Sequence, residues 1–224
     1  MANQTDERIR LTVAQDGSGD CSTIQEAIND VPENNWKHAE IFIKNGVYRE
    51  VVTVPPNKPN IELIGESAEG TVLVYDNYAG KPKPGGGTYG TGGSATLFVY
   101  ADHFSARNLT VKNAFDRKAH PDAKNTQAVA VYAHGRRISF RNVRILGRQD
   151  TLYANGGTQY YYKCYIEGDV DFIFGGARAV FEACDIFSLD RGLEVNGYAT
   201  AASTKISEPY GFLFLNCRLA GNAA

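Results

Sequence analysis

A chain of 224 residues with 43% hydrophobic and 21% charged side chains can bury a sizeable core, which favours one ordinary globular domain. Its formal net charge of -2, without any run of lysine and arginine, excludes the basic surface that a nucleic-acid partner requires. No apolar segment is long enough to span a bilayer, and the N-terminal MANQTDERIR lacks the apolar centre of a secretory signal. We therefore expect a soluble chain, or an already processed one, with no nucleic-acid or membrane partner.

The first predicted element is a short helix within residues 22–32, STIQEAINDVP. Ser22 or Thr23 can serve as the N-cap, Glu26 follows at about the spacing of a capping box, and Pro32 ends the pattern. We expect this helix to cover the open end of the solenoid that the next segments predict.

A repeat runs through the chain beyond residue 100. The segments RNLTV, RNVRI, KCYIE, ACDIF and NCRLA recur after short runs of aromatic or β-branched residues. Their anchors are Asn108, Asn142, Cys164, Cys184 and Cys217, at intervals of 34, 22, 20 and 33 residues. A strand-only repeat of about twenty residues, twice lengthened by an insertion, predicts an all-β parallel β-helix with an internal ladder of these anchors. A β-sandwich whose strands are similar by chance is the alternative.

Two acidic stretches, GRQDTLY and VDFIFGG, share the period of this repeat. Asp171 follows Asp150 by 21 residues, so we expect the two carboxylates at equivalent positions on adjacent coils, roughly 4.8 Å apart. Gln127 precedes Gln149 by 22 residues, which brings two amides to the same patch. Carboxylates this close separate into an acid of raised pKa and a base or nucleophile, and neutral amides can stabilise an oxyanion. The pattern predicts an acyl-transfer site; the alternative is that the aspartates are turn formers satisfied by backbone amides.

The histidines and cysteines show no pattern typical of a metal centre. The histidines stand alone in the sequence, and the cysteines are too few and too scattered for a disulfide framework and include no CxxC pair for zinc. The sequence therefore predicts no histidine-based metal site or catalytic triad and no zinc site.

Five segments, in matching order and spacing, make the chain similar to the pectin methylesterases: GVYRE, SAT, QAVAVY, GRQDTLY and DFIFGG. VAQDGSGDCSTIQEAI near the start and GYATAASTKISEPYGF near the end also resemble this family, so the resemblance covers almost the whole chain. It implies a right-handed parallel β-helix forming one domain over residues 1–224. It further implies a secreted esterase that acts on pectin without a cofactor.

The resemblance also implies catalytic roles. Asp171 matches the nucleophile that attacks the methyl ester carbonyl of a galacturonate unit. Asp150 matches the general acid that protonates the departing methanol and then serves as base for the hydrolytic water. Gln149 and Gln127 are similar to the amides that stabilise the oxyanion.

Substrate contacts are implied in the same way. Thr96 and Gln127 match positions that contact the substrate. Tyr153 and Phe174 resemble aromatic residues that line the sugar-binding cleft, with ordinary packing as their alternative role.

One departure from the family concerns its GRPW segment, whose arginine orients the nucleophile and whose tryptophan floors the cleft. This chain ends at NCRLAGNAA without that segment; its single tryptophan, Trp36, lies far upstream, and Arg218 follows a strand anchor. We expect a chain that lacks the family's last coils and tail. Weak activity and self-association through the exposed C-terminal coil follow as expectations.

Two other functions fit parts of this pattern. The chain can be a catalytically impaired β-helix that binds pectin, because the orienting arginine is absent. It can also be an enzyme of the pectate lyase or polygalacturonase type, since these share the architecture and carboxylates can bind calcium or act as a glycosidase pair. Release of methanol distinguishes the esterase from both.

Overall fold

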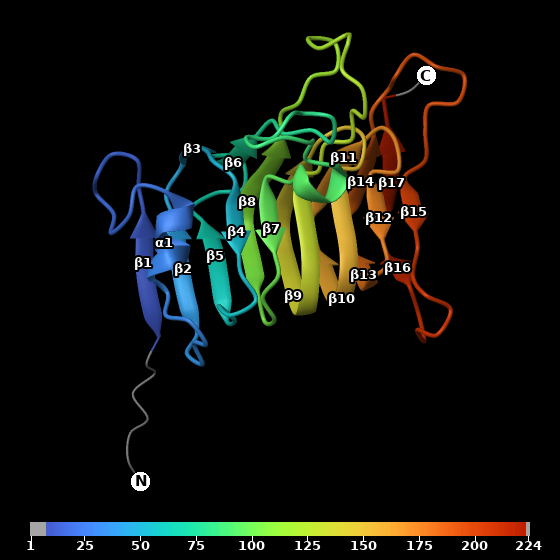
Figure 1. The fold of residues 1–224 in the computed structure, drawn as a ribbon. Helices are drawn as coiled ribbons and strands as arrows, with labels where there is room; N and C mark the ends of the chain where they lie inside the picture. Colours follow the sequence, from blue (N-terminus) through green and yellow to red (C-terminus); the bar gives the residue numbers. More distant parts are fainter. Residues whose placement is uncertain (1–7, 223–224) are drawn as a thin grey trace.

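The structure, a computed structural model, describes residues 8–222. Its 17 strands form one continuous sheet in which successive turns of the chain pair in parallel, and the sheet coils into a right-handed parallel β-helix (Figure 1). The all-β solenoid predicted from the repeat is confirmed. A sandwich is ruled out because each coil pairs with the coil before it.

The strands stack into three columns, which we call faces 1, 2 and 3. Face 1 contains β1 (Ile9–Val13), β2 (Ala39–Ile43), β5 (Ile61–Gly65), parts of β8 (Ser105–Asn113), β9 (Val131–Leu146) and β10 (Leu152–Tyr162), then β13 (Arg178–Glu182) and β16 (Phe212–Leu215). Face 2 contains β3 (Gly46–Arg49), β6 (Thr71–Tyr75), parts of β8 and β9, then β11 (Tyr165–Gly168), β14 (Asp185–Ser188) and β17 (Arg218–Gly221). Face 3 contains β4 (Val52–Val54), β7 (Leu97–Val99), parts of β9 and β10, then β12 (Ile173–Gly175) and β15 (Thr200–Ala202).

Left-handed backbone turns the chain from face 1 to face 2 on five successive coils. The residues at this corner have φ between 51 and 55°: Asn108, Asn142, Lys163, Ala183 and Asn216. Asparagine adopts this conformation readily, whereas lysine and alanine do so because the stacked coils above and below fix the corner. The strand register, in which Arg144 pairs with Tyr165, makes Lys163 the equivalent of Asn142. The sequence repeat, which aligned Asn142 with Cys164, was therefore wrong by one residue.

The predicted internal ladder of asparagine and cysteine separates into two ladders. Cys164, Cys184 and Cys217 stack inside the solenoid as free thiols, and their sulfur atoms contact carbonyl oxygens of the preceding coil, as Cys184 Sγ does with the Tyr161 oxygen at 3.4 Å. Asn142 instead lies outside, where its Nδ2 donates to Asn108 Oδ1 at 3.0 Å. A mixed internal ladder was a wrong prediction because the asparagine and cysteine positions are adjacent, not equivalent.

An aromatic stack fills the interior behind face 1. The ring centroids of consecutive coils lie 5.2 Å apart between Phe140 and Tyr161, and 4.7 Å apart between Tyr161 and Phe181 and between Phe181 and Phe214. Offset stacks of this kind add to the stabilisation from burial. They also fix the spacing of the coils, and thus the spacing of any residues that the coils carry outside.

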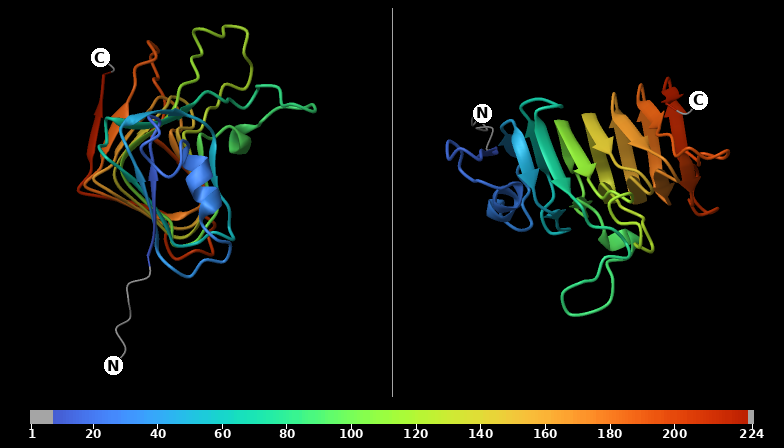
Figure 2. Two further views of the ribbon diagram at one scale, coloured as in Figure 1. Left: turned by 90° about the vertical axis from the view of Figure 1, so that its left-hand side faces the viewer. Right: turned by 90° about the horizontal axis from the view of Figure 1, so that it is seen from above.

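Helix α1 (Ile24–Asp30) covers the N-terminal end of the solenoid (Figure 2). Thr23 is the N-cap and forms a capping box with Glu26, and the carboxylate of Glu50 accepts hydrogen bonds from the first two backbone amides of the helix at 2.8 and 3.0 Å. Ile24 and Ile28 are buried in the main core. The predicted capping helix is confirmed. None of the helices within residues 8–222 has the length and apolarity to cross a membrane.

Candidate active site

Face 3 carries the two aspartates that the repeat placed on adjacent coils. Asp150 and Asp171 lie two residues before β10 and β12, where Leu152 pairs with Ile173, so the two residues occupy equivalent positions one coil apart. Both have left-handed backbone, with φ of 65 and 46°. The backbone amide of Asp150 donates to the Val170 carbonyl at 3.0 Å. Non-glycine residues rarely adopt this conformation, and a matching pair of them marks a site held in shape by its surroundings.

The surroundings of Asp150 favour its protonated form. Its side chain is nearly buried, with 9% of the residue exposed. Loss of hydration raises the pKa of its carboxyl to about 7, helped by the negative charges of Asp171 and Asp169. Asp150 therefore holds a proton at mildly acidic pH and can donate it to a leaving group.

Gln127 and Gln149 lie on successive coils beside the aspartates. The backbone amide of Ala128 donates to the Gln149 carbonyl at 3.1 Å, which stacks the two loops. Gln149 Oε1 accepts a hydrogen bond from Thr126 Oγ1 at 3.3 Å, so its NH2 group is the end that can serve a ligand. Gln127 Oε1 is buried and lacks a hydrogen-bond partner within residues 8–222.

An aromatic row continues from the aspartates along face 3. The rings of Tyr153 and Phe174 stack with centroids 4.2 Å apart, Tyr132 meets Tyr153 edge-on at 5.0 Å, and Phe98 lies 5.8 Å from Tyr132. The sequence analysis predicted Tyr153 and Phe174 here but missed Tyr132, which precedes Tyr153 by 21 residues and could have been found from the same period. The half-buried tyrosine and phenylalanine rings form an apolar platform of the type that lines ligand clefts.

Thr96 was predicted to contact the substrate, but its side chain lies inside the solenoid. It is fully buried, and its hydroxyl donates to the Lys112 carbonyl at 3.0 Å. The side chain anchors the start of β7 to the neighbouring coil, and the predicted substrate contact of Thr96 stays a prediction.

Three charged residues near the aspartates were not among the predicted site residues: Asp169, Arg148 and Arg117. Asp169, two residues before Asp171, has a side chain only 2% exposed, and it lies near the guanidinium groups of Arg148 and Arg117. Arg148 and Asp169 are 21 residues apart, the interval of the two predicted aspartates. The period of the repeat therefore also predicts this pair, although its two members carry opposite charges.

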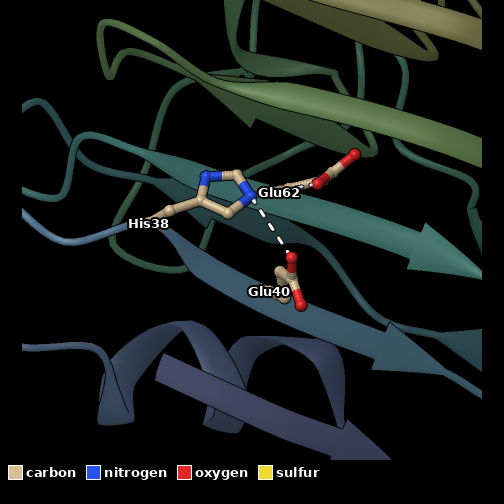
Figure 3. Close-up of side chains that lie close together, drawn as sticks. All are labelled: His38, Glu40 and Glu62. Carbon is tan, nitrogen blue, oxygen red and sulfur yellow. Dashed lines mark hydrogen bonds and ion pairs between the residues drawn. The ribbon is translucent and has the colours of Figure 1, made fainter. Parts of the chain in front are cut away.

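One group of side chains within residues 8–222 has the spacing of metal ligands: His38, Glu40 and Glu62 on face 1 (Figure 3). Arginines already bind its carboxylates, with Arg8 Nη1 2.7 Å from Glu40 Oε1 and Arg107 Nε 3.0 Å from Glu62 Oε1. The cluster is a network of ion pairs on the N-terminal coils. It also corrects the expectation that His38 stands alone, because His38 Nε2 lies 3.1 Å from Glu62 Oε2.

A solenoid whose successive coils pair in parallel belongs to the class of parallel β-helix proteins. Within that class, the chain belongs to the pectinesterase family, whose model matches residues 10–224. Pectinesterase QRT1 of Arabidopsis thaliana is 38% identical over 221 residues, which cover 98% of this chain and 57% of that protein.

Solved structures agree with this assignment. Pectin methylesterase PemA from Erwinia chrysanthemi superimposes with a TM-score of 0.89 at 38% identity, covering 96% of this chain and 66% of PemA. A pectin methylesterase variant in complex with a hexasaccharide also gives a TM-score of 0.89, at 39% identity, covering 95% of this chain and 66% of that one. The chain spans less than two thirds of the length of each of these relatives.

Proposed function

We propose that this protein hydrolyses the methyl esters of galacturonate units in pectin, releasing methanol and leaving free carboxylates. The observation that carries the proposal is the stacking of Asp150 on Asp171 across adjacent coils, with a pKa of about 7 at Asp150. Gln127 and Gln149 lie on one side of this pair, and the aromatic row lies along the same face.

In the first half of the reaction, the Asp171 carboxylate attacks the ester carbonyl carbon, and the carbonyl electron pair moves onto oxygen. The amide groups of Gln127 and Gln149 donate hydrogen bonds to this oxyanion. The carbon–methoxy bond then breaks, and Asp150 transfers its proton to the methoxy oxygen. Methanol leaves, and the galacturonyl group remains attached to Asp171 as an anhydride.

In the second half, Asp150 is a carboxylate and accepts a proton from water while the water oxygen attacks the galacturonyl carbon. Collapse of this intermediate expels the Asp171 carboxylate and leaves a free galacturonate. Asp150 again holds its proton, so one ester and one water have become one acid and one methanol.

The aromatic row supplies the binding platform in this proposal. Tyr153 and Phe174 are stacked and half-buried, so a sugar ring can lie on their exposed faces while its polar edges stay in water. Gln127 is the further substrate contact that we propose.

The domain organisation and the location of the protein are part of the same proposal. We propose that residues 1–224 belong to one β-helical domain and that the protein acts outside the cell, where its polymer lies. Leu213, Leu215 and Leu219 on the last described coil are 52, 43 and 72% exposed, and self-association through this coil stays a prediction.

The test is methanol release from highly methyl-esterified polygalacturonate by the full-length protein and by Asp171→Ala. We expect the variant to lose at least about 10³-fold in kcat, because it removes the carboxylate that forms the acyl intermediate. Asp185→Asn, which changes an aspartate on face 2, is the matched control and should retain full activity. Methanol release that Asp171→Ala leaves unchanged would overturn the nucleophile. Unsaturated or reducing sugar ends in place of methanol would favour the lyase or hydrolase alternatives.

A further inference from the structure

Asp169 is a buried carboxylate that the proposed reaction does not use. Its Oδ2 lies 3.5 Å from Arg148 Nη1, and its Oδ1 lies 3.8 Å from Arg117 Nη2 and makes no hydrogen bond within residues 8–222. Burial of a carboxylate is unfavourable unless a cation accompanies it. The two guanidinium groups supply that charge from the wall of a pocket of about 440 Å³, which Asp169 also lines.

The backbone around this cluster joins the two loops that carry the proposed catalytic aspartates. The amide of Asp169 donates to the Arg148 carbonyl at 3.1 Å, and the amide of Asp150 donates to the Val170 carbonyl at 3.0 Å. Arg148 therefore lies beside Asp169 in the same register in which Asp150 lies beside Asp171. The oppositely charged pair Arg148–Asp169 thus lies two residues before the like-charged pair Asp150–Asp171 on the same two loops.

This arrangement has a direct electrostatic consequence. The carboxylates of Asp150 and Asp171 repel when both are ionised, which favours separation of the loops, whereas Arg148 and Asp169 attract each other across the same gap. The next coil also approaches the cluster closely. A Cβ atom at Gly197 would lie only 2.0 Å from the Asp169 carbonyl oxygen, so only glycine fits at this position. The loop of Asp169 is thus fixed from both sides.

We propose that the Arg148–Asp169 ion pair positions the proposed esterase site, holding the loop of Asp150 against the loop of Asp171 at the separation that acyl transfer requires. This inference rests on the proposed function. Arg148 and Asp169 are positioning residues, because they act through the two aspartates and touch no reacting atom. The negative charge of Asp169 has a second effect, since it helps to raise the pKa of Asp150.

The experiment is a double-mutant cycle in the full-length protein, with Asp169→Asn, Arg148→Gln and the double variant. The measurements are kcat and KM for methanol release across pH, together with thermal unfolding. Each single variant should lower kcat about tenfold or more while KM changes less than about twofold, because a small displacement of a catalytic group lowers the rate of the chemical step. The double variant should be no slower than the slower single variant, because both changes break the Arg148–Asp169 ion pair and the other effects of Asp169 are already lost in Asp169→Asn.

Two further readouts separate positioning from simple stabilisation. Asp169→Asn should move the alkaline limb of the kcat profile to lower pH, because loss of a nearby negative charge makes Asp150 easier to ionise. Arg148→Lys keeps the charge and should restore kcat to within about threefold of the wild type. The matched control is Arg218→Gln, which breaks the ion pair of Arg218 Nε with Asp185 Oδ1 at 2.7 Å outside the site and should leave kcat unchanged.

If Asp169→Asn and Arg148→Gln keep the wild-type kcat and pH profile and only unfold at lower temperature, the pair is structural and the inference is wrong. Additive losses in the cycle would equally overturn it, because independent effects do not describe one ion pair. A wild-type protein that releases no methanol would overturn the proposed function instead, and this inference with it. Asp169→Asn changes only one atom of the side chain, so it carries the test if Arg148→Gln does not fold.

Discussion

Two acidic clusters on this solenoid each stack two acidic residues on adjacent coils, but the pKa shifts of their carboxyl groups have opposite directions. On face 1, Glu40 pairs directly with Glu62 of the next coil, as Asp150 matches Asp171 on face 3 (Figure 3). Arg8 and Arg10 bind Glu40, and their hydrogen bonds and charge keep the pKa of this carboxyl below its usual value.

On face 3, burial and further carboxylates act in the other direction and raise the pKa of Asp150 to about 7. A parallel solenoid brings like residues together on adjacent coils wherever the sequence repeats them. Burial and the charges around such a pair therefore decide its role. Stacked carboxylates that are paired with arginine, such as Glu40, remain charged and hold adjacent coils together. A stacked carboxylate that is buried among other acids, such as Asp150, keeps its proton and can act as a proton donor.

Asp150→Asn should produce the largest difference between the two clusters. It removes the proposed proton donor while keeping the shape of the side chain, so we expect kcat for methanol release to fall about 10²- to 10⁴-fold. Glu40→Gln is the matched change on face 1 and should leave kcat within about twofold. Circular dichroism would check that both variants fold. Equal losses in the two variants would show that the clusters do not differ in the way described.

The pH dependence of stability should have opposite signs at the two clusters. The folded-state pKa of Asp150 is raised from 3.8 to about 7, so its contribution to stability is lost as pH rises through this range. The pKa of Glu40 is lowered from 4.5, so its contribution is present above that pH and is lost as pH falls.

The unfolding temperature of Asp150→Asn minus that of the wild type should therefore rise from pH 4 to pH 8. The same difference for Glu40→Gln should fall over this range. The Glu40 effect should be small, about 1 kcal/mol or less and a few degrees, because its ion pairs are partly exposed. Thermal unfolding of the two variants and the wild type at both pH values measures this. Changes of the same sign in both variants would contradict the assigned environments.

The period of the repeat made most of the fold and the centre of the site predictable. Because coils stack at a fixed spacing, an interval of 21 residues between Asp150 and Asp171 becomes a contact between neighbouring coils. The same reasoning would have found Tyr132 and the Arg148–Asp169 pair. The Arg148–Asp169 pair joins unlike residues, so a repeat of one residue type does not reveal it, whereas Tyr132 and Tyr153 are such a repeat.

Other features depend on contacts that no local pattern encodes. Thr96 directly precedes a strand, where the alternation of inward and outward side chains is not yet established, so its burial could not be read from the sequence. Lys163 and Ala183 adopt left-handed backbone that neither residue favours, because the neighbouring coils impose it. This is also why the repeat in the sequence aligned Cys164, and not the adjacent Lys163, with Asn142.

The most direct test of the central claim is the pKa of Asp150, measured by NMR titration of its carboxyl carbon in the wild type, Asp171→Asn and Asp169→Asn. Burial among acids predicts a wild-type pKa of about 7 and a lower value in each variant, because each removes one of the negative charges that oppose ionisation. A wild-type pKa near the ordinary value of 3.8, unchanged by either substitution, would contradict the assignment of Asp150 as the proton donor.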